Sequence, residues 1–92
     1  MNIDYSAIDE LFRLHDIDGL IASGAPDDEY EPEVEKIFAR LETLPSDQAT
    51  VPALVSIFEG VWTQMCGGNE KTIARRRPDF EDIAQKVMNY FG

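Results

Sequence analysis

Residues 51–66 read VPALVSIFEGVWTQMC, and this stretch decides the fold. Its apolar side chains cover more than one face of a helix; they are Val51, Leu54, Val55, Ile57, Phe58, Val61, Trp62, Met65 and Cys66. A helix with so wide an apolar surface contacts several neighbours rather than one. Gly67 and Gly68 then end the pattern, because glycine adopts the left-handed conformation common just past a helix. The stretch predicts a central helix with Trp62 in the core.

Three further helical patterns flank this stretch, and no segment alternates apolar and polar residues as a strand would. They cover residues 6–14, 32–44 and 79–90. Proline is favoured in the first turn of a helix, so the second pattern begins near Pro32, and Pro45 stops it. The sequence therefore predicts a single domain over residues 1–92, an all-α compact bundle of four helices.

The helix ends also carry local signals. Ser6 followed by Asp9 resembles a capping box at the start of the first helix. Pro78 disfavours helix in the residue before it, so we expect the fourth helix to begin at Asp79, with Asp79 as its cap. Residues 67–77 then form a polar connection, and the sequence predicts at most a short helical turn in it.

A long link joins the first two helices, reading HDIDGLIASGAPDDEY over residues 15–30. Links of this length in a compact domain are usually functional or ordered by their own residues. Asp16 and Asp18 can bond backbone N–H groups in the turn after the first helix. The acidic run at residues 27–29 can pair with the unsatisfied N–H groups at the start of the second. We therefore expect a long ordered link, and the same residues can be structural or functional.

At these residues the chain resembles the YugE-like family of small bacterial proteins. The resemblance rests on Asp16-x-x-Gly19-Leu20 followed by Gly24-Ala25-Pro26-x-Asp28-Glu29-Tyr30, and it covers roughly the first half of the chain. The family pattern has tryptophan and proline where this chain has His15 and Ile17. The resemblance implies a small helical domain without an assigned activity. Related sequences with the motif also look like immunity proteins encoded beside bacterial toxins.

Charge is the strongest compositional signal, because 18 acidic and 8 basic residues give a net charge of −10. Residues 1–70 hold 15 of the acidic and 3 of the basic residues. A field of this sign repels nucleic acid and anionic membranes, and it speeds association with basic partners. The run from Arg75 to Arg77 is too short and has no interleaved aromatic residue to predict nucleic-acid binding. The acidity can also serve solubility alone.

The chain lacks both an apolar run of the roughly 18 residues that a membrane helix needs and a secretory signal pattern. Its single cysteine, Cys66, cannot form an internal disulfide. We therefore expect a cytoplasmic protein with no membrane association.

The sequence offers little for catalysis, metals or cofactors. Asp16-Ile17-Asp18-Gly19 starts like a calcium loop, but Leu20 and Ile21 stand where that loop needs Asp or Asn and then glycine. His15 and Cys66 are the only histidine and the only cysteine. They could form a nucleophilic pair, but a thiol ending an apolar helix is usually an inert packing group. We therefore predict no enzyme, no metal site and no cofactor.

These observations favour a small acidic protein-binding module, similar to an immunity protein or antitoxin, that occludes a basic partner. The predicted partner-binding residues are Asp16, Asp18, Asp27, Asp28, Glu29, Tyr30 and Glu33. Tyr30 would be an aromatic anchor; Tyr5 and Tyr90 are the other tyrosines expected to reach a partner. The alternative is a structural or self-associating helical domain whose acidic motif only determines the fold. A homodimer is compatible with either function, because the aromatic content can exceed what one small core buries.

Overall fold

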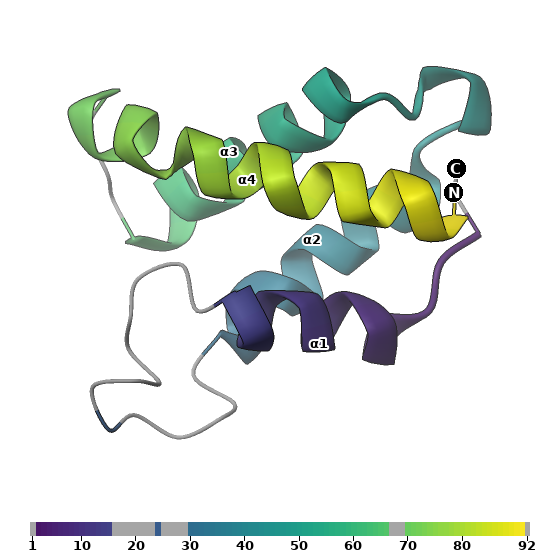
Figure 1. Cartoon of the computed structure of the whole chain (residues 1–92), viewed down its shortest axis with the longest axis horizontal. Coiled ribbons are helices and arrows are strands. Elements are labelled where there is room, and N and C mark those ends of the chain that lie inside the picture. Colours follow the sequence, from purple (N-terminus) through teal and green to yellow (C-terminus); the bar gives the residue numbers. More distant parts are fainter. Residues whose placement is uncertain (1, 16–23, 25–29, 67–69, 92) are drawn as a thin grey trace.

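The computed structural model describes residues 2–15, 24, 30–66 and 70–91. These residues form four α-helices and one short 3₁₀ helix, without a strand in the described ranges. The elements are α1 (Tyr5–His15), α2 (Glu31–Thr43), η1 (Ser46–Gln48), α3 (Val51–Cys66) and α4 (Glu70–Phe91) (Figure 1). The predicted all-α bundle is confirmed.

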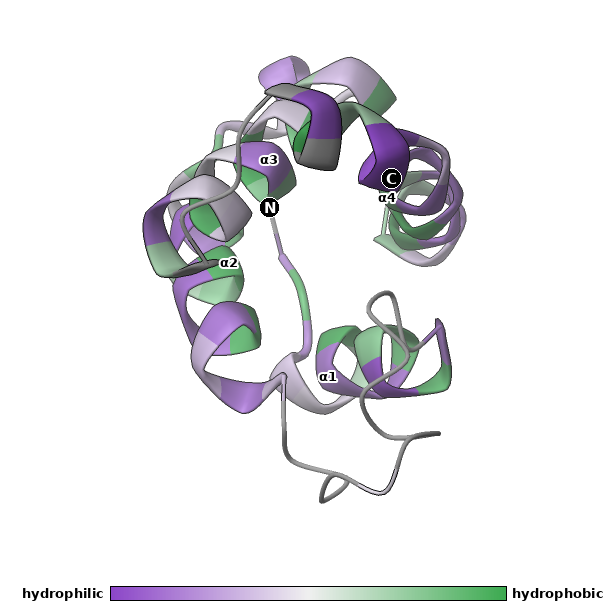
Figure 2. Ribbon diagram, turned by 90° about the vertical axis from the view of Figure 1, so that its left-hand side faces the viewer, coloured by the Kyte–Doolittle hydropathy of each residue, from purple (hydrophilic) through white to green (hydrophobic). Residues whose placement is uncertain are grey.

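The helices surround a common interior, with each one packed against its neighbours in the order α1, α2, α3, α4 and back to α1 (Figure 2). Trp62 of α3 is fully buried in this interior. Its ring stacks on Phe12 of α1 at 5.8 Å between centroids and meets Phe80 of α4 edge-on at 5.3 Å. The expectation of a central α3 holding the core tryptophan is confirmed.

Helix α3 has the predicted bounds because its start is capped by the preceding residue. The backbone N–H of Ala53 donates to Thr50 Oγ1 at 3.3 Å, and that of Leu54 donates to the Thr50 carbonyl at 3.0 Å. Pro52 costs no hydrogen bond at the second position, since N–H groups in the first turn have no partner within the helix. Thr50 and Pro52 together fix where α3 begins.

The expected start of α4 at Asp79 is wrong, because the helix begins nine residues earlier at Glu70 and contains Pro78. The part before the proline is held on α3. Ile73 is buried at 8% exposure, and Arg77 Nη2 lies 2.9 Å from Glu59 Oε2. Pro78 itself is exposed, so its ring faces solvent rather than a packed neighbour. Burial of Ile73 in the core and the ion pair with α3 favour the helix over residues 70–77 against the loss of one backbone hydrogen bond.

The expected capping box at Ser6 is also wrong. Helix α1 begins at Tyr5, and the N–H of Ile8 donates to the Asp4 carbonyl at 3.2 Å, so Asp4 occupies the cap position. Asp9 pairs instead with Arg13 one turn later, at 3.1 Å. An i,i+4 ion pair along the helix thus takes the carboxylate that the capping box required.

Candidate functional site

Most of the predicted partner-binding residues lie outside the part of the chain that the structure describes. Asp16, Asp18 and the acidic run at 27–29 belong to this group, as does most of the predicted ordered link. Their role therefore stays a prediction. Tyr30 and Glu33 are described.

Tyr30 is not an exposed anchor, contrary to the prediction. Its side chain is 2% exposed, and its ring lies 6.3 Å from that of Trp62. Its carbonyl accepts the N–H of Val34 at 3.0 Å, which starts α2. The residue stands one helical turn before Val34 and two before Ile37, and both of these are fully buried. Tyr30 therefore joins the apolar stripe of α2 and fastens its start to the core.

Glu33 is half-buried, and its Oε2 atom is buried. It stands three residues after Tyr30 and four before Ile37, so it lies beside the buried stripe of α2. Of the two described members of the predicted site, Tyr30 thus faces the core and Glu33 is only partly exposed.

The outward carboxylates at the start of α2 are Glu31 and Glu35, which are one helical turn apart and exposed. Neither pairs with a cation among the described residues. Sequence reasoning placed them in the acidic region but did not select them. The 3.6-residue period could have found them, because residues 31 and 35 share a face that residues 30, 34 and 37 do not.

The Tyr5 side chain of α1 lies against α2. The Tyr5 ring packs edge-on against Phe38 at 5.4 Å, and its hydroxyl is buried without a hydrogen-bond partner among the described residues. The pKa of this phenol is raised, first by burial and then by the charges of Asp9, Glu31 and Glu35. We call Asp9, Glu31 and Glu35 the acidic junction; Asp9 is paired with Arg13, so the exposed Glu31 and Glu35 carry its unpaired charge among the described residues.

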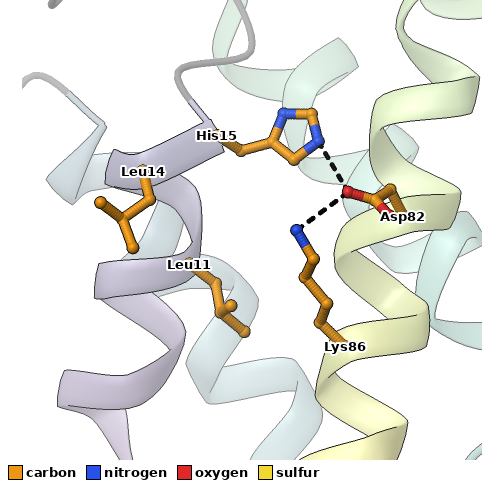
Figure 3. Close-up of a pocket in the computed structure, with 5 residues that line it drawn as sticks. All are labelled: Leu11, Leu14, His15, Asp82 and Lys86. Atoms are coloured by element: carbon orange, nitrogen blue, oxygen red, sulfur yellow. Dashed lines mark hydrogen bonds and ion pairs between the residues drawn. The ribbon is translucent and has the colours of Figure 1, made fainter.

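A second feature is a hollow of about 310 Å³ between α1 and α4, lined by Leu11, Leu14, His15, Asp82 and Lys86 (Figure 3). His15 and Lys86 both point to the Asp82 carboxylate. His15 Nε2 and Lys86 Nζ each lie 3.1 Å from Asp82 Oδ2. His15 Nδ1 is 3.8 Å from Asp79 Oδ1. The end of α1 is thereby tied to α4 by polar contacts.

The pKa of Asp82 is lowered, chiefly by the hydrogen bond from Lys86, with a smaller contribution from His15. A carboxyl whose pKa is lower in the folded chain binds fewer protons there than when unfolded. Its stabilising contribution is therefore complete above its ordinary value of 3.8 and is lost as the pH falls through the lowered value. The Asp82 cluster has the geometry of a structural tie between helices.

We expect Asp82→Asn to lower the thermal midpoint at pH 6 and to change it less at pH 2, because the wild-type carboxyl binds a proton as the pH falls through its lowered pKa. Thermal unfolding followed by circular dichroism at both pH values measures this difference. Asp47→Asn is the matched control, because Asp47 is exposed and forms no ion pair with a described residue. An equal effect of Asp82→Asn at the two pH values would contradict the role assigned to the ion pair.

No group of metal-binding side chains occurs among the described residues. The Cys66 side chain lies outside the described part, so the His15–Cys66 pair is untested. Within the described ranges, no helix is both long and apolar enough to cross a membrane. Comparisons with protein-family models, with curated proteins and with solved structures find no match.

Proposed function

We propose that this chain is a non-enzymatic, cytoplasmic protein-binding module whose acidic junction receives a basic partner and occludes it. The observation that carries the proposal is the exposed pair Glu31 and Glu35, one helical turn apart at the start of α2 and without a cation partner among the described residues, in a chain of net charge −10. The sequence-based resemblance to YugE-like and immunity proteins agrees with this function and stays a prediction.

The negative charge of Glu35 does not stabilise the fold. A carboxylate in the first turn of a helix is stabilised by the helix dipole, and Glu31 stands there. Glu35 lies beyond that turn, and like charges four residues apart destabilise a helix by about 0.2–0.5 kcal/mol. An exposed acidic pair that costs stability is explained if the pair attracts a partner. Such charges mainly raise the association rate, while a few anchoring contacts supply the affinity.

The test compares capture from a lysate of the source cells by three tagged proteins. They are the wild type, Glu31→Gln/Glu35→Gln, and the control Glu42→Gln/Asp47→Asn, which removes the same two charges at exposed positions elsewhere. We expect one stoichiometric basic protein to bind the wild type and the control at low salt and to be released at high salt. The junction variant should capture about tenfold less, because steering depends on local charge.

Equal capture of this partner by all three proteins would remove the acidic junction from the interface. If the chain captures no partner at either salt concentration, the result favours the alternative function, a structural or self-associating domain. In that case the junction variant should differ from the wild type only in thermal stability.

A further inference from the structure

We draw no further inference here: the strongest candidate, the hollow between α1 and α4 that the exposed side chains of Leu14 and Tyr90 line, carries none because nothing in the structure shows what covers it.

Discussion

Replacing Trp62 with alanine is expected to lower the free energy of unfolding by about 3–5 kcal/mol, the range for large aromatic residues in cores. The side chain is fully buried and contacts rings from three other parts of the chain: Phe12, Tyr30 and Phe80. Its removal leaves a cavity that these rings cannot fill without breaking their own packing. Domains of this size have a total stability of roughly 5–15 kcal/mol, so the variant loses a large fraction of it.

Urea denaturation followed by far-ultraviolet circular dichroism measures this loss. Thr63→Ala is the control, since Thr63 is the next residue on α3 and is exposed. Trp62→Phe should cost less than Trp62→Ala, because a smaller aromatic ring retains part of the contact. A loss for Trp62→Ala no larger than that of the control would show that Trp62 is not the centre of the core.

Replacing Pro78 with alanine is expected to raise the free energy of unfolding by about 2 kcal/mol. A proline inside a helix is about 3 kcal/mol less favourable than alanine, because it removes a backbone hydrogen bond and crowds the preceding turn. Alanine would let residue 78 donate to the carbonyl of Ala74. Part of the gain is offset, by about 0.4–1 kcal/mol, since alanine leaves the unfolded chain more conformational freedom.

Pro52→Ala is the matched control, because Pro52 stands in the first turn of α3 and its ring removes no helical hydrogen bond there. The same denaturation experiment should show the control unchanged or less stable, and Pro78→Ala more stable. Unchanged or lower stability of Pro78→Ala would mean that the proline itself is needed for the burial of Ile73 and for the Arg77–Glu59 ion pair.

Pro78 also shows where sequence reasoning ends. Thr50, Pro52 and the width of the apolar face determine α3 locally, so its bounds could be predicted. The helix before Pro78 depends on burial of Ile73 and on the Arg77–Glu59 ion pair, which joins residues 18 positions apart. The sequence rule that proline disfavours helix in the preceding residue includes the cost of Pro78 but not these distant contacts. The rule therefore places the start of α4 at Asp79 instead of Glu70.

The candidate surfaces also have features that local sequence predicts and features that depend on contacts between distant residues. The acidity at the start of α2 is visible in the sequence, and helical periodicity separates Glu31 and Glu35 from the half-buried Glu33. Tyr30 follows a polar run, so the sequence predicts an exposed side chain. The side chain is buried because it packs against Trp62, which is distant in the sequence. His15 and Asp82 are 67 positions apart, and nothing local to either residue indicates that they meet.

Because His15 is tied to Asp82 and Tyr30 is packed on Trp62, the chain between them joins two fixed points on the bundle. Closing a loop costs free energy that grows only with the logarithm of its length, about 0.6 kcal/mol for each doubling. Insertions or deletions between those anchors should therefore cost the bundle little, whatever path the intervening residues take. Sequences sharing this bundle could diverge in that segment while conserving the two anchors, and a foreign peptide grafted there should leave the helices intact.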